Sequence, residues 1–259
     1  MKTFIKFSLI FISAILLIAC NNEQKKLANE KLSVLNKDSK SLTESCLYQY
    51  AAKYDELLTL DQASSIVGLD KTKADTSYKK MMKDPAFQAF EMEWKGNRKR
   101  KIDTGFGIIE SPKPDYITLS GMKLMTLESF NKDFGVKTEA EIKEVLNRLD
   151  NAFDKALDQK SESKEANEAG KKVTETGVSK EEAKAVQNKI SEGPIAKTLR
   201  GYQIVNGLGD AASWNTFDQK LNVLKDGVRF YLEVDINDDT NVNKVKAIEV
   251  AKLILAKCN

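Results

Sequence analysis

The chain has 259 residues, of which 41% are hydrophobic and 31% are charged, with 13 glycines and 4 prolines. This composition is typical of one or two globular domains and excludes a collagenous chain. The chain has no histidine. That absence excludes Ser-His-Asp and Cys-His triads, HExxH zinc sites and the two-histidine facial triad. The sequence identifies no catalytic, cofactor-binding or metal-binding residue.

The first 19 residues have the pattern of an export signal. Lys2 and Lys6 precede a run from Phe7 to Ala19 that is apolar except for two serines. Such a run is too short to cross a hydrocarbon core about 30 Å thick, and its length is typical of the apolar region of a signal peptide. It ends in Leu17-Ile18-Ala19-Cys20, which resembles the lipobox of bacterial lipoproteins.

The resemblance to bacterial lipoproteins implies that residues 1–19 are removed and that Cys20 is lipidated on its thiol, with acyl chains such as palmitate. Each buried CH₂ of such a chain contributes about 0.8 kcal/mol to membrane binding. Asn21 stands where an Asp would signal inner-membrane retention in some Gram-negative bacteria, so the resemblance favours the outer membrane there. A Gram-positive surface is an alternative, as is an ordinary secretory signal or an uncleaved leader with Cys20 incidental.

Charge gives no indication of a nucleic-acid partner. Removal of Lys2 and Lys6 with the leader lowers the formal net charge from +3 to +1, and a chain so close to neutral lacks the usual electrostatic footprint. Residues 20–42 are polar and predict a flexible tether. We expect residues 43–259 to form a single domain.

Helical periodicity begins the predicted domain. Leu and Tyr recur at i, i+3 and i+4 over residues 47–58, which predicts one helix. Thr59 and Gln62 match a capping box, and Gly68 marks the end of a short second helix.

Alternating or β-branched residues predict strands. Five segments carry this pattern: 90–94, 116–119, 211–214, 221–224 and 228–236. Asp226-Gly227 between the last two is a strong hairpin signal.

Further helices are predicted between and after the strands. Thr126 is expected to cap a short helix to Phe134, and a capping box at Thr138 opens a long amphipathic helix to Ala156. Residues 159–178 are polar and charge-rich, and they are interpreted as an exposed continuation of that helix or a disordered insert.

Two helices complete the expected set. Ser179 and Glu182 form another capping box, opening a helix that Gly193-Pro194 ends, and a last helix covers 242–256. The resulting class is α+β, with a mainly antiparallel sheet of about five strands and helices packed on one face.

Two cysteines remain once Cys20 is assigned to the anchor. Cys46 and Cys258 lie near the two ends of the predicted domain, and an exported protein occupies an oxidising compartment. We therefore predict a disulfide between them, with a pair of free buried thiols as the alternative. Neither is a catalytic candidate because no histidine is present to activate it.

One segment concentrates positive charge. Five cations fall within seven residues between two predicted strands: Lys95, Arg98, Lys99, Arg100 and Lys101. The simpler interpretation is a solvated hairpin loop. The functional interpretation is an anion-binding loop that meets acidic lipid, lipopolysaccharide or a polyanionic glycan.

Three further motifs carry weaker signals. The alternating Asp and Asn residues from Asp235 to Asn243 resemble a calcium loop, but Lys246 occupies the position of the bidentate Glu, so we expect turns and a helix cap. Trp94 and Trp214 lie on predicted strands, as core residues or as platforms for glycan stacking.

Gly209-Asp210-Ala211 before Trp214, and Leu57-Leu58-Thr59, resemble stretches in small bacterial envelope lipoproteins of unknown function. The Gly-rich stretch itself is typical of a tight turn.

Together these features predict a protein lipid-anchored on the exported side of a bacterial envelope membrane. Its body is expected to be a non-catalytic module that binds an envelope protein, lipid or glycan. The alternative is a carboxylate-based hydrolase acting on envelope glycans, which would need no histidine.

Overall fold

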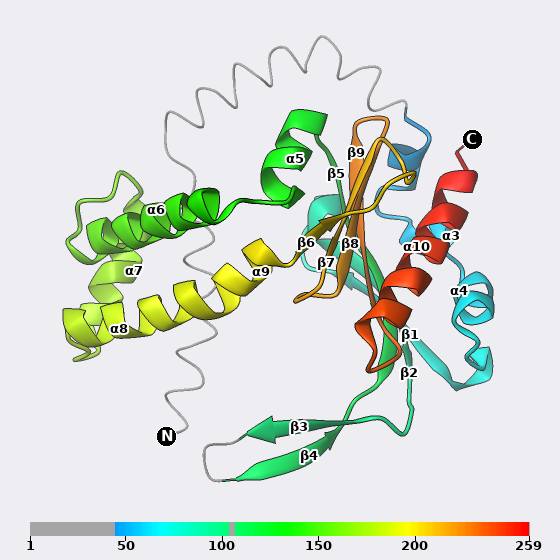
Figure 1. Ribbon diagram of the computed structural model, residues 1–259, viewed down its shortest axis with the longest axis horizontal. Coiled ribbons are helices and arrows are strands. Elements are labelled where there is room, and N and C mark those ends of the chain that lie inside the picture. The colour runs from blue at the N-terminus through cyan, green and yellow to red at the C-terminus, as the bar shows by residue number, and fades with distance from the viewer. Residues whose placement is uncertain (1–44, 104–106, 259) are drawn as a thin grey trace. The chain divides into compact units, whose positions relative to one another are not determined.

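The structure is a computed structural model that describes residues 45–103 and 107–258. The described chain divides into two compact units (Figure 1). Residues 45–136 and 201–258 form the sheet unit, and residues 137–200 form the helical unit. The single domain expected over 43–259 is thus divided, with the helical unit inserted into the sheet unit. The leader, Cys20 and the tether at 20–42 lie outside the described residues.

The sheet unit is built on one antiparallel sheet, in the order β1-β2-β5-β9-β8-β7-β6. The strands are β1 (Ala74–Lys80), β2 (Gln88–Trp94), β5 (Asp115–Leu124), β6 (Tyr202–Ile204), β7 (Ala211–Asn215), β8 (Lys220–Lys225) and β9 (Val228–Asp235). A separate pair, β3 (Lys99–Asp103) and β4 (Ile108–Pro112), forms a two-stranded hairpin. The α+β class is confirmed.

The five predicted strands are the five inner strands of the sheet. The two that the pattern missed, β1 and β6, are its edges. β1 has no fully buried residue, and β6 has only three residues. Alternation of apolar and polar side chains therefore never develops in either strand, and the sequence gives no strand signal there.

One face of the sheet carries the main core. Alternate residues such as Met92, Ile117 and Leu232 point to it and are fully buried. Helices cover this face: the 3₁₀ turn Leu47–Tyr50, α3 (Tyr54–Leu57), α4 (Leu60–Val67) and α10 (Thr240–Ala256) (Figure 1). Apolar burial on this face supplies the main driving force for folding of the unit.

The single helix predicted over 47–58 is wrong, because the chain breaks at Ala52, whose φ is +66°. The break allows Tyr54 to enter the core, where its hydroxyl forms hydrogen bonds with two backbone groups. Its hydroxyl donates to the carbonyl of Pro85 at 2.7 Å and accepts the amide of Met122 at 2.9 Å. Helical spacing identified the apolar residues correctly, but it did not reveal the hydrogen bonds that the Tyr54 hydroxyl forms in the core.

The predicted helix starts and turns are confirmed. Capping boxes form at Thr59, Thr138 and Ser179, each with its Gln or Glu three residues later. Gly68 ends α4 in the left-handed region with a φ of +74°. Asp226-Gly227 also adopts positive φ at both residues, as a tight two-residue hairpin turn requires.

The second face of the sheet is covered at one corner by α5 (Leu127–Phe134). Phe130 packs there against Leu224 and Met125, with Phe134 and Ala211 at the margin. Leu224 alternates with Val223 of the main core, so this small cluster lies on the opposite face.

The helical unit consists of α6 (Glu139–Leu157), α7 (Lys164–Glu175), α8 (Lys180–Ile190) and α9 (Ala196–Arg200). Residues 159–178, expected to be a continuation of the preceding helix or disordered, contain α7 as a separate helix. Its buried face is narrow and made of small residues, namely Ala166, Gly170 and Val173. Such a face adds little to the hydrophobic content of a segment, so composition did not reveal it.

Gly193-Pro194 does not end α8 as expected. The chain continues through a π-helical turn, Ser191–Ile195, directly into α9. A wider π turn accommodates a proline inside a helix, because Pro has no amide hydrogen and its ring clashes with the usual preceding carbonyl. None of the helices in the described ranges combines the length and apolarity needed to cross a bilayer.

Candidate functional site

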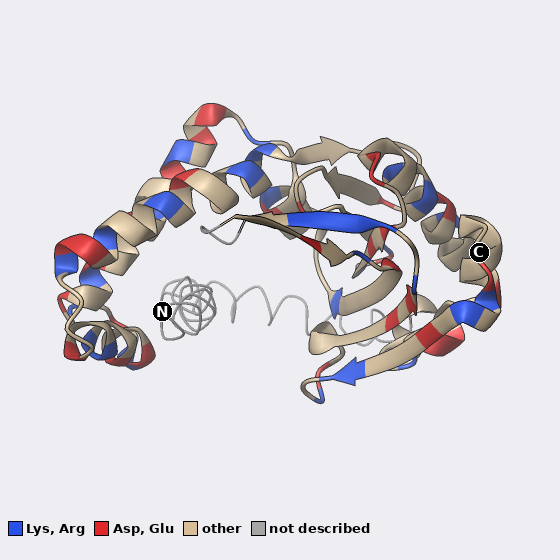
Figure 2. Ribbon diagram, turned by 90° about the horizontal axis from the view of Figure 1, so that it is seen from below, with Lys and Arg blue, Asp and Glu red and all other residues tan. Residues whose placement is uncertain are grey.

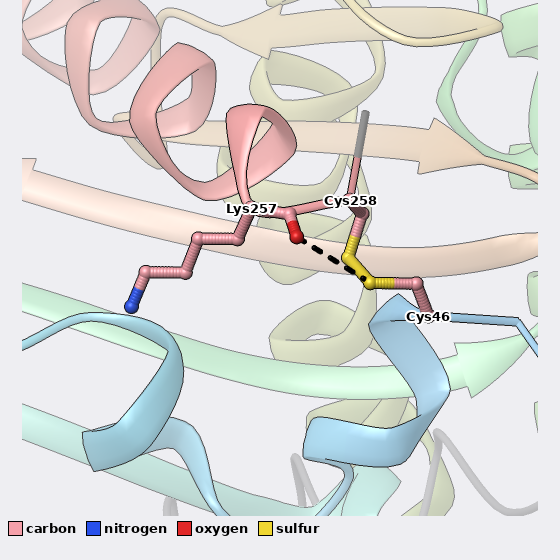
Figure 3. The surroundings of a disulfide bond; sticks show 3 residues. All are labelled: Cys46, Lys257 and Cys258. Atoms are coloured by element: carbon pink, nitrogen blue, oxygen red, sulfur yellow. Dashed lines mark hydrogen bonds between the residues drawn. A yellow bond between two sulfur atoms is a disulfide. The ribbon is translucent and has the colours of Figure 1, made fainter.

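Cys46 and Cys258 lie side by side in the structure, with Sγ atoms 2.04 Å apart and Cα atoms 5.5 Å apart (Figure 3). The predicted partners are therefore at bonding distance. The carbonyl oxygen of Lys257 lies 3.7 Å from Sγ of Cys46. A disulfide sulfur has no hydrogen to donate, so this contact is a polar approach only. The pair joins the two ends of the sheet unit and leaves no reactive thiol there.

The predicted anion-binding loop runs from the end of β2 into β3. Lys95 Nζ lies 3.0 Å from Asp75 Oδ2, and Lys99 Nζ lies 2.9 Å from Glu110 Oε2. All four side chains are exposed. Exposed ion pairs contribute at most about 1 kcal/mol, so both lysines can exchange these partners for an external anion.

Arg98 differs from its neighbours because its side chain is only 15% exposed. Its Nε donates to Asp115, Nη1 donates to Asp235 and Asp238, and Nη2 donates to the carbonyl oxygens of Pro114 and Asp235. These contacts match the five N–H donors of a guanidinium group. Arg98 therefore has no donor left for an external anion and does not belong to the predicted site.

The network around Arg98 fixes the base of the β3–β4 hairpin. Burial lowers the pKa of Arg98, but hydrogen bonds to Asp235 and Asp115 outweigh this and raise it. Lys113 Nζ also lies 3.0 Å from Asp235 Oδ1. Asp115 and Asp235 are the buried carboxylates of the described chain, and both are engaged by cations in a structural ion-pair network.

Each face of the hairpin carries both a cation and an isoleucine, because Arg100 shares a face with Ile109 and Lys101 shares a face with Ile108. Arg100 and Lys101 are exposed on β3 and form no ion pair within the described residues. Ile108 and Ile109 on β4 are 68% and 52% exposed. Figure 2 shows Lys and Arg as the blue part of β3. Free cations beside exposed apolar side chains suit a surface that is both anionic and apolar.

A groove of about 550 Å³ lies between α5 and the β6–β7 turn. Leu127, Phe130 and Phe134 line one side, and the turn from Asn206 to Asp210 lines the other. Asp210 is the single acidic residue in its wall. Its carboxylate accepts the amide of Asp226 at 2.6 Å, as a turn residue would.

A second cationic site was missed from the sequence. Arg229 on β9 is 9% exposed, and Lys123 on β5 is its cross-strand neighbour. Arg229 occupies an outward position in the alternating pattern, which predicted only a solvent-facing residue. Pairing with Lys123 depends on the β5–β9 register, and no short-range sequence signal encodes that register.

Two of the weaker motifs have structural roles. Trp94 and Trp214 are core residues, 3% and 1% exposed. Asn243, fully buried, accepts the amides of Ile236 and Asn237 and holds the turn before α10. The expected turn and cap interpretation of the Asp/Asn run is therefore confirmed for these residues.

No family model, curated protein or solved structure matches the chain.

Proposed function

We propose that the protein is a bacterial lipoprotein, anchored through Cys20 on the exported side of an envelope membrane, whose body is a non-catalytic binding module. The leader resembles that of the lipoprotein class. The β3–β4 hairpin supports a site of action at the membrane surface and carries this proposal. It offers Arg100 and Lys101, which form no ion pair within the described residues, together with exposed Ile108 and Ile109.

Charge and apolarity of the hairpin fit an anionic lipid surface. Each cation near such a surface contributes about 1 kcal/mol. A tether from Cys20 would hold the domain close to the bilayer, so that weak contacts of this size suffice. A glycan partner would use the cations but would leave the two isoleucines without a role.

Vesicle co-sedimentation tests whether the hairpin binds an anionic membrane. The chain from residue 21 onward is mixed with phosphatidylglycerol-containing or purely phosphatidylcholine vesicles. We expect binding to the anionic vesicles that falls at least about tenfold when Arg100 and Lys101 are both changed to Gln. The same loss of charge at Lys189 and Lys252, which are exposed elsewhere, is the matched control. Equal binding of both double variants would reject the membrane contact.

The anchor is tested in cells with a clickable palmitate analogue. Label should enter the wild-type protein and should be absent from Cys20→Ser, which should also leave the membrane pellet. An unlabelled wild-type protein would reject the anchor and leave the hairpin result unaffected.

The alternative hydrolase requires two carboxylates facing one open cavity. The groove beside α5 has a single acidic residue in its wall, Asp210, and the buried pair Asp115 and Asp235 is bound to Arg98. These observations favour the binding module.

A further inference from the structure

Two cations face each other where β5 meets β9. Lys123 and Arg229 are cross-strand partners, and neither forms an ion pair with a carboxylate within the described ranges. Like charges directly opposite in a sheet destabilise it, and burial of an unpaired charge is costly. By contrast, Lys220 on the neighbouring strand is paired with Glu233 at 3.4 Å. The charge of Asp133 raises the pKa of both cations, but no carboxylate of the described ranges lies within ion-pairing distance of either one.

Two aromatic rings lie close to the guanidinium group of Arg229. The carbon Cζ lies 5.2 Å from the ring centroid of Phe134 and 5.3 Å from that of Tyr231. Rings over a guanidinium occupy its faces and leave the N–H donors of its edge. The buried Nε has no hydrogen-bond partner among the described groups.

The backbone of β5 is shaped to admit these side chains. The register shifts between Ser120 and Lys123, and Gly121 lies in this bulge with a φ of +69°. A Cβ atom at Gly121 would lie 2.4 Å from Tyr231 Cε1 and 2.9 Å from Arg229 Nη1. Only glycine fits there, so the bulge creates the space that the arginine and the tyrosine occupy.

We propose that Arg229 and Lys123 bind an oxyanion, the carboxylate or phosphate group of a ligand, with the rings of Phe134 and Tyr231 packed against the guanidinium. The two terminal nitrogens of Arg229 form a planar fork that matches two oxygens of such a group, and Lys123 supplies a second positive charge. The site is separate from the hairpin and the lipid anchor, so each proposal can fail without the other.

The directions of the pKa shifts of Lys123 and Arg229 agree with this geometry. Burial, followed by the charge of Arg229, lowers the pKa of Lys123. Burial also lowers the pKa of Arg229. A bound anion would oppose both effects, because an opposite charge nearby favours the charged form.

Thermal unfolding of the purified full chain tests the site, with acetate or inorganic phosphate replacing chloride at constant ionic strength. Binding to the native state raises the midpoint. We expect one of these anions to raise it for the wild type and for the control Lys252→Met, whose lysine is exposed on α10. The more effective anion identifies the chemical class of the ligand.

Two variants remove the cations individually. Arg229→Met should melt at or above the wild type in chloride, because it replaces an unpaired buried charge by an apolar side chain, and it should not respond to either anion. Lys123→Met should bind the effective anion about ten- to a hundredfold more weakly, which is the loss of one charged hydrogen bond. If Arg229→Met does not fold, the anion response of Lys123→Met alone tests the proposal.

The proposal is overturned if the wild type responds to neither anion, or if the variants respond as the wild type does. An Arg229→Met protein that melts well below the wild type, together with a wild type that ignores both anions, would assign Arg229 to fold stability instead.

Discussion

Arg98 shows how a single residue can turn from a functional candidate into a structural one. In the sequence it is one of five cations in a basic segment. In the structure its five donors meet Asp115, Asp235, Asp238 and a backbone carbonyl of Pro114. Removal of one partner from a buried charge network leaves the others uncompensated, and this loss exceeds the net stabilisation that the pair supplied.

Arg98→Met should therefore destabilise the protein by about 3–5 kcal/mol, because Asp115 would remain buried without a cation and Asp235 would keep only Lys113. Arg100→Met, two residues along and exposed, should change stability by about 0.5 kcal/mol or less. Urea unfolding followed by tryptophan fluorescence measures both. Equal stability of the two variants would show that the network contributes little.

Some residues of the candidate sites are neighbours in the sequence, and others meet only in the folded structure. The basic segment is visible because its members are neighbours in sequence. Arg229 and Lys123 are 106 positions apart and meet only through the β5–β9 register. The exposure that separates Arg98 from Arg100 also depends on distant residues, chiefly Asp235. Sequence therefore revealed the charges but not which of them are free.

Among the elements, α7 approaches α6 closely at one glycine. A Cβ atom at Gly170 would lie 2.1 Å from the carbonyl oxygen of Ala156 on α6. The backbones of α6 and α7 can approach because this position has no side chain. Next to this contact, Val173 of α7 packs in a buried cluster with Phe153 and Leu157 of α6.

Gly170→Ala should destabilise the helical unit by about 1–3 kcal/mol, because the overpacking exceeds the gain of about 1 kcal/mol in helix propensity. Lys172→Ala on the same helix is the control, since the side chain of Lys172 is exposed. It should be neutral or slightly stabilising. Thermal unfolding monitored at 222 nm distinguishes the two, and a stabilised Gly170→Ala would disprove the close contact.

Local rules predicted the elements well wherever they act within a few residues. Caps at Thr59, Thr138 and Ser179 and the turn at Asp226 all formed as expected. Predictions failed where a distant partner decides. The helix over 47–58 breaks to place Tyr54 against the sheet, and the edge strands exist because a neighbouring strand offers its backbone.

The capping boxes of the helical unit should make it sensitive to acid. Hydrogen bonds from Thr138 and Ser179, backbone first, lower the pKa of Glu141 and Glu182. A carboxyl whose pKa is lower in the folded state stabilises that state above its unfolded pKa, near 4.5 here, and the contribution is lost as the pH falls through the folded pKa. Helicity at 222 nm should fall in this range.

Glu141→Gln with Glu182→Gln should flatten this acid dependence. Glutamine maintains the box without titrating, as Gln62 does at the start of α4. An unchanged acid profile in the double variant would assign the sensitivity to other carboxylates, such as Asp158 and Glu139, whose pKa values are lowered by Lys180 and Arg200.

At the scale of the whole molecule, the two units differ in the spectroscopic signals that follow their unfolding. In the sequence, the helical unit is inserted between α5 and β6 of the sheet unit. Both tryptophans, Trp94 and Trp214, belong to the sheet unit. Tryptophan fluorescence therefore follows the sheet unit alone, while far-ultraviolet circular dichroism is dominated by helices of both units.

The Cys46–Cys258 bond should stabilise the sheet unit selectively. It closes a loop with a sequence separation of 212, for which chain entropy gives an upper value of about 5 kcal/mol. Reduction by dithiothreitol should therefore lower the fluorescence midpoint of urea unfolding. Because the helical unit contains neither cysteine, the midpoint of its unfolding transition should shift less.

A Cys46→Ser, Cys258→Ser double variant is the control, because it should unfold at the lower midpoint and ignore the reductant. Non-reducing peptide mapping should join the two cysteines in the wild-type protein. Two thiols that alkylate after unfolding without reductant would contradict the bond. Equal shifts of both transitions would instead show that the two units unfold together, since only coupled unfolding transmits a constraint in one unit to the other.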